Sequence, residues 1–326
     1  MKFLIVGLGS IGRRHLRNLI ALGERDIILF RTNHSTLDLE EFSSIPVFHN
    51  LEAALGEGPD GVVISNPTAL HLDAAIPAAR AGCAILMEKP ISQNLARIEE
   101  LKSSLKRGEG NLLMGFQFRF HPTLRKVAEW VQQGEIGRPL SFNCQWGEYL
   151  PGWHPWEDYR QSYAARADLG GGVLRTLCHP LDYLGWIFGD ATLRWGFTGK
   201  VSDLEIDVED LVKASLHYPG GVEGSLMLDY FRQPPLHKLE ITGSNGLIEW
   251  KNNTGAARIY RTTIGDWETA LPPEGFDRND LFLEEMRHFI RMKRGEEAPL
   301  CNLEDGLRTQ RLVQEIYDFS AKQNNK

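Results

Sequence analysis

Two side chains in this 326-residue sequence are suited to moving a proton to or from a substrate oxygen. Lys89 stands between Glu88 and Pro90, directly after the apolar run 83–87. A lysine at the end of a buried strand can hydrogen-bond a substrate oxygen or relay its proton; the alternative is a surface lysine in a loop. His179 follows a triple glycine after a short interval. Histidine suits the transfer of a hydroxyl proton, but a lone histidine in an apolar helix is often a packed core residue.

A glycine-rich turn near the start of the chain predicts the cofactor. The apolar run 1–6 leads into Gly7-Leu8-Gly9-Ser10-Ile11-Gly12, followed by a helix over 13–22 and a strand over 26–30. In this context the spacing is a dinucleotide-binding fingerprint rather than a merely structural turn. The first glycine makes the turn, the second lets the backbone approach a pyrophosphate, and the third lets helix and strand pack closely. The N-terminus of the helix supplies N–H groups for the phosphates.

The end of the second strand bears on which dinucleotide binds. NAD-specific sites usually place an acid there to accept from the ribose 2′-hydroxyl, but here Phe30 is followed by Arg31 and Thr32. Arg31 could pair with a 2′-phosphate through charge-assisted hydrogen bonds. We therefore predict NADP, with NAD as the alternative. Arg13 and Arg14 lie in the first helical turn, where the helix dipole disfavours cations; they either face a bound anion or are solvated.

The first part of the chain alternates strands with helices. Strands are expected over 45–48, 61–65, 83–87 and 111–116, and helices over 51–55, 70–81 and 95–106. This alternation predicts a doubly wound, parallel Rossmann sheet, in which ligands bind outside the carboxyl ends of the strands. That rule brings the glycine turn and Arg31 to one rim. The later strand ends add Asn66, Pro67, Glu88, Lys89, Pro90 and Gln117.

Past about residue 120 the pattern changes. Helices are expected over 121–134 and 173–188, and consecutive strand candidates with tight turns between 191 and 261 predict an antiparallel sheet. The chain ends with helices expected over 281–293 and 303–321, the second capped by Asn302.

These patterns predict an α/β protein of two domains. Residues 1–120 form the dinucleotide-binding domain. Residues 121–326 form an α+β domain with a large, mostly antiparallel open sheet. One alternative is that the C-terminal helix packs back on the first domain.

An aromatic stretch in the second domain would suit sugar recognition by stacking and charged hydrogen bonds. Aromatic side chains also serve as core or interface residues, so both interpretations stay open. The stretch contains Tyr149, Trp153, His154, Trp156, Tyr159 and Tyr163, with Arg160 and Arg166.

Composition excludes several classes of function. A net charge of −7 argues against binding to nucleic acid or to membrane surfaces. The four cysteines form no CxxC pair, so neither a zinc site nor a disulfide framework is expected, and thiols fit a reducing compartment. His71, His121 and His154 lack metal-ligand spacing, so we predict no metal. No apolar run approaches the ~20 residues of a membrane span, and we expect a cytoplasmic protein.

Several motifs occur together in a fixed order. The glycine fingerprint is followed by Glu88-Lys89-Pro90, Gly115-Phe116-Gln117, and a triple glycine before His179-Pro180-Leu181-Asp182. From Met1 to about Ser320 the chain resembles the glucose–fructose oxidoreductase / inositol dehydrogenase (Gfo/Idh/MocA) family. The resemblance implies a Rossmann domain and a second domain whose open sheet often forms homodimers or homotetramers. It also implies NAD- or NADP-dependent dehydrogenases or reductases that act on CH–OH groups of sugars and cyclitols.

The resemblance carries roles to individual residues. It implies that Lys89 is the catalytic lysine and His179 the acid/base histidine. The expected cofactor-binding residues are Gly7, Gly9, Ser10, Ile11, Gly12, Arg31, Thr32, Asn66, Pro67, His71, Glu88, Lys89 and Gln117. The expected substrate-binding residues are Arg119, Tyr149, Trp153, Tyr163, Arg166, Arg175, Thr176 and His179.

One departure from the family pattern concerns the acid that usually lies one turn before the histidine. Here Arg175 and Thr176 occupy those positions. Either His179 uses another partner, or the substrate supplies an acid that Arg175 binds, or catalysis is slow or absent. The alternatives are therefore a non-catalytic NAD(P)-binding sensor or partner subunit, and a net redox-neutral enzyme with a recycled cofactor. The stretch 149–163 also resembles a subgroup associated with surface-polysaccharide or acidic-sugar metabolism.

Overall fold

The computed structural model describes residues 1–32 and 40–324. The chain divides into two compact units. Unit 1 contains Met1–Gln117 and Asp277–Leu307, and unit 2 contains Phe118–Phe276 and Arg308–Lys326. No helix in the described ranges is long and apolar enough to cross a membrane. All four cysteines are buried thiols.

The described part of unit 1 is built on a six-stranded parallel sheet in the order β3-β2-β1-β4-β5-β6. The strands are β1 (Lys2–Val6), β2 (Asp26–Phe30), β3 (Val47–Phe48), β4 (Gly61–Ile64), β5 (Ala84–Glu88) and β6 (Leu112–Gly115). The central strands are buried almost throughout because helices cover both faces of such a sheet. The predicted doubly wound parallel sheet is confirmed.

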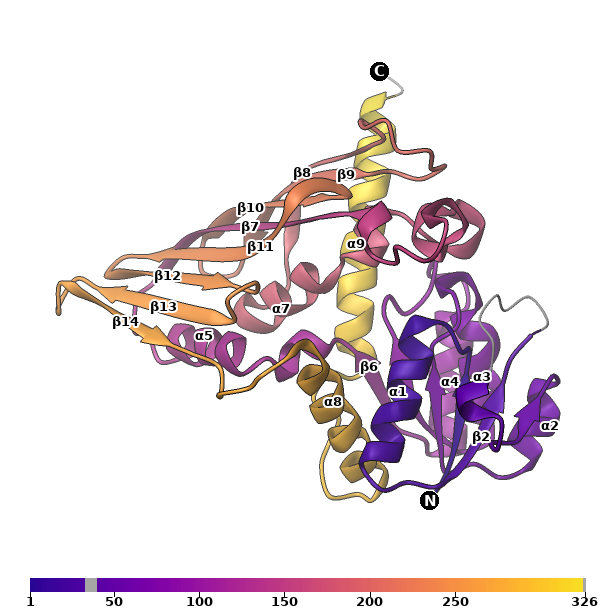
Figure 1. Cartoon of the computed structure of the whole chain (residues 1–326). Helices are drawn as coiled ribbons and strands as arrows, with labels where there is room; N and C mark the ends of the chain where they lie inside the picture. The colour runs from indigo at the N-terminus through magenta and orange to yellow at the C-terminus, as the bar shows by residue number, and fades with distance from the viewer. Residues whose placement is uncertain (33–39, 325–326) are drawn as a thin grey trace. The chain divides into compact units, whose positions relative to one another are not determined.

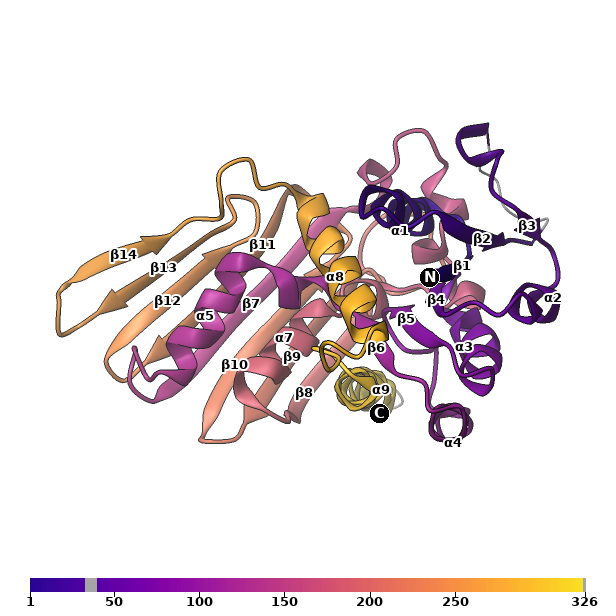
Figure 2. The ribbon, with the colours of Figure 1, turned by 90° about the horizontal axis from the view of Figure 1, so that it is seen from below.

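Among the described residues, four α-helices follow strands of unit 1, and a fifth α-helix of this unit comes from late in the chain. They are α1 (Ser10–Ala21), α2 (Leu51–Gly56), α3 (His71–Arg80), α4 (Ile98–Gly108) and α8 (Arg278–Lys293). Figures 1 and 2 show α8 beside α1. Asn279 on α8 donates to Asn18 on α1 at 3.0 Å, and Phe289 packs on Phe3 with ring centroids 6.1 Å apart. The segment 277–307 therefore completes the core of unit 1.

Unit 2 is built, in the part that the structure describes, on an eight-stranded sheet in the order β14-β13-β12-β11-β7-β10-β9-β8. The strands are β7 (Pro139–Tyr149), β8 (Thr192–Gly199), β9 (Leu211–Tyr218), β10 (Val222–Asp229), β11 (Phe231–Gly243), β12 (Gly246–Lys251), β13 (Ala256–Arg261) and β14 (Asp266–Ala270). All neighbours are antiparallel except β7 and β10. The predicted large, mostly antiparallel sheet is confirmed. β14 lies beyond the range 191–261 in which strands were expected, because it is polar and largely exposed and so lacks an apolar pattern.

The helices of unit 2 are α5 (Pro122–Gln132), α6 (Val173–Thr176), α7 (His179–Phe188) and the part of α9 (Leu303–Asn324) from Arg308 onward. Figures 1 and 2 both show α5 and α7 on the same face of the sheet. Asn302 caps α9, as predicted: its side chain accepts from the backbone N–H groups of Glu304 and Asp305.

The single helix expected over 173–188 is broken into α6 and α7. Pro180 has no N–H to donate to the carbonyl of Thr176, so the hydrogen-bond ladder cannot continue. The chain turns at Leu177, and α7 starts with Pro180 in its first turn. His179 is therefore the first residue of a helix, not a residue in the middle of one.

Candidate active site

The glycine turn of unit 1 has the geometry that a dinucleotide site needs. Gly7 has a φ of +88°, and a Cβ there would lie 2.7 Å from the backbone nitrogen of Asn66. A Cβ at Gly12 would lie 2.1 Å from the Gly7 carbonyl oxygen, so helix and turn touch there. A Cβ at Gly9 would meet no atom within 4 Å, which leaves that side of the backbone open to a ligand. Gly7 thus allows the turn, Gly12 the close packing of the helix, and Gly9 the approach of a ligand to the backbone.

The first turn of α1 directly follows this open glycine. Gly9 is the N-cap residue, and because it has no side chain it cannot cap the helix. The N–H groups at the start of α1 are therefore suited to phosphate oxygens. Ser65 supports the turn, since its hydroxyl lies within hydrogen-bond distance of the Val6 and Gly7 carbonyl oxygens, at 3.0 and 2.9 Å.

The parallel strands place most of the predicted cofactor residues on one rim. Because all strands of unit 1 run the same way, their carboxyl ends share one edge. The glycine turn follows β1, and Arg31 and Thr32 follow β2. The other strand ends are followed by Asn66 and Pro67 after β4, Lys89 after β5, and Gln117 after β6.

The arginines near the glycine turn pack against aromatic rings. The guanidinium carbon of Arg14 lies 4.6 Å from the ring centroid of Phe282, and that of Arg13 lies 5.9 Å from that of Phe42. Burial, and then the charge of Arg278, lower the pKa of Arg14. Arg13 also donates from Nε to the Leu8 carbonyl oxygen at 3.3 Å. Both side chains thus have positions that do not depend on a bound anion.

The loop after β5 is fixed from two sides. Glu88 Oε1 lies 2.8 Å from His15 Nε2, and Glu88 Oε2 accepts from the Lys89 backbone N–H at 3.3 Å. His71 Nδ1 lies 2.8 Å from the Pro90 carbonyl oxygen, and its Nε2 lies 3.0 Å from that of Asn66. His71 is buried and spans two strand ends, so its contacts are with the rim itself. The Lys89–Pro90 peptide bond is cis.

The groups around Glu88 favour the ionised form of its carboxyl group. Burial opposes ionisation of the Glu88 carboxyl, but the His15 hydrogen bond and the charges of His15, Lys89 and His71 outweigh it and lower its pKa. Burial lowers the pKa of His71, although the carbonyls of Pro90 and Asn66 oppose the change. Glu88 is thus a carboxylate directly before Lys89.

In unit 2, His179 lies in a buried aromatic layer. Its ring centroid is 5.2 Å from that of Phe118 and 5.6 Å from that of Trp146. Trp146 in turn stacks on His237, with centroids 4.2 Å apart and planes nearly parallel. The His179 side chain is buried, with 2% of the residue exposed. The aromatic layer fixes the position of the ring.

Asp182, one turn after His179, is held by Arg119. The Arg119 guanidinium donates from Nε and Nη2 to the two Asp182 oxygens at 3.0 and 2.7 Å, and both side chains are buried. The sequence predicted that Arg119 binds substrate. In the structure its guanidinium group is bound to Asp182.

This pair allows a stability prediction. We expect Arg119→Ala to lower the free energy of unfolding by about 3–5 kcal/mol, because Asp182 becomes a buried charge without its partner. Urea denaturation measures the loss. The control is Arg166→Ala, which removes an exposed pair with Asp168 and should change stability little. Equal stability of the two variants would show that the buried pair does not stabilise the fold.

The triple glycine before His179 is crowded by backbone. A Cβ at Gly171 would lie 2.3 Å from the Tyr163 carbonyl oxygen, and one at Gly172 would lie 2.4 Å from the Glu209 carboxylate. The N–H of Gly172 donates to the Ala164 carbonyl at 3.0 Å. The glycines therefore let the chain between the aromatic stretch and α6 pass in close contact with its neighbours.

Arg175 has a half-buried acid, Glu209, nearby. Its Nη1 donates to the Gly171 carbonyl at 3.2 Å, and its guanidinium carbon lies 4.5 Å from the ring centroid of Tyr317. The Tyr317 hydroxyl donates to Glu209 at 2.7 Å. Burial raises the pKa of Glu209, although Tyr317 and the charge of Arg175 oppose this. Thr176, the other residue at the departure from the family pattern, is buried.

The aromatic stretch forms short turns after β7. Tyr149 is exposed by 38%, whereas Trp153 packs edge-on against Tyr230 with centroids 5.5 Å apart. Tyr163 is half-buried, and Arg166 is exposed and paired with Asp168. The stretch therefore offers both packed and accessible rings.

Comparisons with known proteins match both units of the chain. The family model described as the oxidoreductase family with an NAD-binding Rossmann fold matches residues 1–116, and the GFO/IDH/MocA C-terminal domain matches residues 124–249. Together they span most of the sequence. The chain belongs to the GFO/IDH/MocA family of oxidoreductases. It is an NAD(P)-dependent enzyme, as the motifs predicted.

Three similar proteins illustrate the chemistry of this family. Myo-inositol 2-dehydrogenase of Thermotoga maritima is 26% identical and covers 94% of this chain, which covers 92% of that protein. The dTDP-3,4-didehydro-2,6-dideoxy-alpha-D-glucose 3-reductase of Actinomadura kijaniata is 30% identical, with coverage of 79% and 75%. The WlbA dehydrogenase from Bordetella pertussis, solved with NADH and UDP-GlcNAcA, has a TM-score of 0.83 at 23% identity, with coverage of 99% and 97%.

Sequence reasoning missed three polar residues that lie beside predicted site residues. His15 and Glu285 lie beside Glu88, and Glu209 lies beside Arg175. Glu285 had a detectable signal, because it interrupts the apolar stripe of its helix between Leu281 and Phe289. A glutamate is rarely buried in the apolar face of a helix unless it has a specific role there.

Proposed function

We propose that this enzyme transfers hydride between the nicotinamide of NADP or NAD and the hydroxyl or carbonyl carbon of a sugar, sugar derivative or cyclitol. The observation that carries the proposal is the fixed loop Glu88-Lys89-Pro90 on the rim that also holds the glycine turn. A lysine anchored on the cofactor rim is suited to hydrogen-bond the oxygen of the reacting carbon.

The two proposed catalytic residues divide the work. In the oxidation direction, a bound nicotinamide would supply the hydride acceptor. His179 takes the hydroxyl proton of the substrate as its carbinol carbon becomes a carbonyl carbon. Lys89 donates to the same oxygen. In reduction the steps reverse, and His179 returns the proton to the oxygen.

The proposed substrate class is a polyhydroxylated ring, free or attached to a nucleotide. The similar proteins act on an inositol and a dTDP-sugar, and one was solved with a UDP-sugar acid. Tyr149 offers an accessible ring for stacking. For an acidic sugar, we propose Arg175 as the charged contact, with Arg166, which pairs with Asp168, as a second one.

The experiment begins with fluorescence titration of the purified protein with NADPH and NADH. A panel of sugars, cyclitols and nucleotide sugars follows, with turnover read from absorbance of the reduced cofactor. Turnover supports the proposal. Tight cofactor binding with no turnover across the panel favours the second candidate, a non-catalytic sensor or partner subunit, which the arginine and threonine at positions 175 and 176 motivate. Product formed without net change in cofactor identifies the redox-neutral alternative.

Arg31 makes the cofactor preference testable. We propose that NADP is preferred and that Arg31 pairs with the 2′-phosphate, because it directly follows β2 on the cofactor rim. Arg31→Ala should weaken NADPH binding by about 10- to 100-fold, the equivalent of one charge-assisted hydrogen bond, and leave NADH binding nearly unchanged. The control is Arg107→Ala, an exposed arginine at the end of α4, before the opposite edge of the sheet. Equal losses for both cofactors would reject the assignment.

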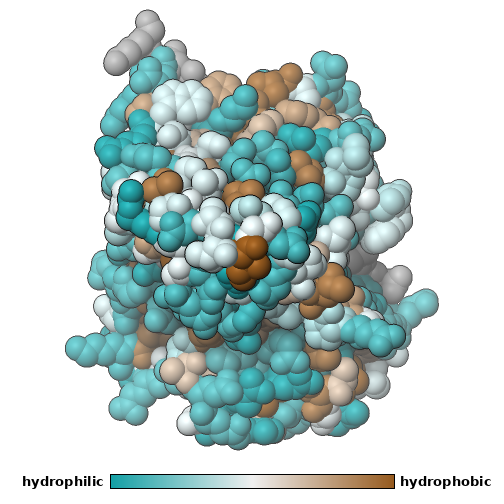
Figure 3. Space-filling view, turned by 90° about the vertical axis from the view of Figure 1, so that its left-hand side faces the viewer, coloured by the Kyte–Doolittle hydropathy of each residue, from teal (hydrophilic) through white to brown (hydrophobic). Residues whose placement is uncertain are grey.

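We also propose self-association through the sheet of unit 2, as a homodimer or homotetramer. Large apolar side chains of unit 2 are exposed at Trp195 on β8 and at Leu271 after β14. On the face drawn in Figure 3, hydrophobic side chains are scattered among hydrophilic ones rather than gathered in one patch. An interface on that face would thus combine polar and apolar contacts. Sedimentation velocity at micromolar concentration measures the assembly.

A further inference from the structure

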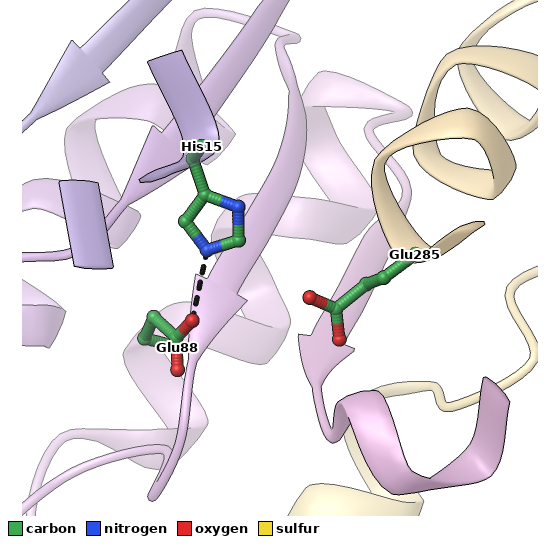
Figure 4. Close-up of side chains that lie close together, drawn as sticks. All are labelled: His15, Glu88 and Glu285. Carbon is green, nitrogen blue, oxygen red and sulfur yellow. Dashed lines mark hydrogen bonds and ion pairs between the residues drawn. The ribbon is translucent and has the colours of Figure 1, made fainter. Parts of the chain in front are cut away.

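Three ionisable side chains meet in the core of unit 1. His15 comes from α1, Glu88 from the end of β5 and Glu285 from α8, and one nitrogen or oxygen of each lies within 4.8 Å of the others. Figure 4 shows the hydrogen bond between His15 and Glu88, with Glu285 directing its carboxyl group toward that pair. His15 and Glu285 are 0% exposed, and Glu88 is 7% exposed.

Glu285 differs from Glu88 in its contacts. Neither of its oxygens has a hydrogen-bond partner among the described residues. Glu88 has both the His15 ring and the Lys89 backbone N–H. Two buried carboxyl groups at such a separation do not both ionise, because each charge opposes the other where water is excluded. The group with the partners keeps the charge.

We propose that Glu285 is a protonated, uncharged carboxylic acid in the folded enzyme, and that it leaves Glu88 as the only anion of the cluster, next to Lys89. The functional part rests on the proposed role of Lys89. Glu285 would be a positioning residue, since it acts through Glu88 and not on the substrate. Burial, and then the charge of Glu88, raise the pKa of Glu285 well above its ordinary range, which agrees with the geometry.

A divalent cation is the other occupant that an imidazole and two carboxyl groups could accept. The surroundings favour a proton. Glu88 already faces the positive charges of Lys89 and Arg14, and its oxygen is hydrogen-bonded to His15. A dication would be repelled by these charges, whereas a proton on Glu285 adds no net charge to the core beyond that of Glu88.

Several charged or titratable groups face the cluster from the elements packed around it. They are Arg14 and His15 on α1, His71 on α3, Glu88 and Lys89 at the end of β5, and Asp277 and Arg278 at the start of α8. Because these groups are unchanged in a Glu285 variant, comparison with the wild type isolates the titration of Glu285.

The first test is the pH dependence of stability in wild type and Glu285→Gln. An acid whose pKa is raised on folding binds a proton in the folded state that the unfolded chain has released above about pH 4.3. The wild-type unfolding constant should therefore rise relative to that of the variant by about tenfold for each pH unit from about pH 5 up to neutral pH. Glu284→Gln, which changes the exposed neighbour on α8, should show no such trend. A ratio that does not rise with pH would overturn the proposal.

The second test is infrared spectroscopy of the purified protein at pH 7. The spectrum of wild type minus Glu285→Gln should contain the carbonyl stretch of a protonated carboxyl group, shifted by 13C-glutamate, and the corresponding Glu284→Gln difference should not. Absence of this band overturns the proposal. So does one equivalent of tightly bound divalent metal in the wild type that is lost in Glu285→Gln. Neither readout needs turnover, so a failed redox function and a failed Glu285 assignment give different results.

Discussion

Replacing Lys89 with methionine should lower kcat by about 10,000-fold, while the dissociation constant of the reduced cofactor changes little. This is the upper end of the effect of a proton donor or acceptor, and equals about 5 kcal/mol of activation free energy. Methionine keeps the length of the side chain and removes only the charge and the hydrogen-bond donors. Stopped-flow absorbance of the cofactor with the best substrate of the panel measures the loss.

The matched control for Lys89 is Lys106→Met, an exposed lysine in the last turn of α4. It should keep wild-type kcat and stability. Because the loop after β5 is fixed by Glu88 and Pro90, we expect the Lys89 variant to fold normally. Retained turnover in Lys89→Met would remove the lysine from the mechanism, whatever the cofactor affinity.

The second large effect is expected for His179→Gln, with kcat lowered by about 100- to 10,000-fold. Glutamine keeps a polar group in the aromatic layer but cannot take up the hydroxyl proton. The limb of the pH profile of kcat that reports the base should disappear in the variant. Burial beside Phe118 and Trp146 makes a stability measurement necessary alongside the kinetics.

A half-buried histidine on the sheet of unit 2 serves as the comparison. His217 on β9 pairs with Glu223 at 2.8 Å, and His217→Gln should leave kcat unchanged. If His179→Gln loses less than threefold in kcat with an unchanged pH profile, then His179 is a core residue. In that case the substrate hydroxyl proton passes to another group.

Much of the fold could be predicted from local patterns in the sequence. Alternation of apolar runs and helical periods indicated the Rossmann sheet, and the sheet then placed Gly7, Arg31 and Lys89 on one rim because parallel strands end together. Pro180 also carried a readable signal for the break between α6 and α7, since proline cannot donate to the preceding turn. These features depend on neighbours within a few residues.

Long-range features were not readable in the same way. The sequence around Glu285 does not indicate that its helix packs beside α1. The sequence around Glu88 does not indicate that His15 is its hydrogen-bond partner. Such contacts arise from tertiary packing, which local propensity does not encode. The parallel pairing of β7 with β10 is similar, because about seventy residues separate the two strands.

Unit 1 is discontinuous in sequence, and this has a consequence for how the protein is made. During synthesis the first 117 residues leave the ribosome long before α8, which contributes Phe282 and Phe289 to the same core. Domains usually fold as units, from the N-terminus onward. Until α8 has been translated, the face of α1 that carries His15 and Asn18 lacks its partners Phe282 and Asn279. A dinucleotide site built in this way matures only after unit 2 has almost entirely emerged, so chaperone contacts with nascent chains should concentrate in that interval.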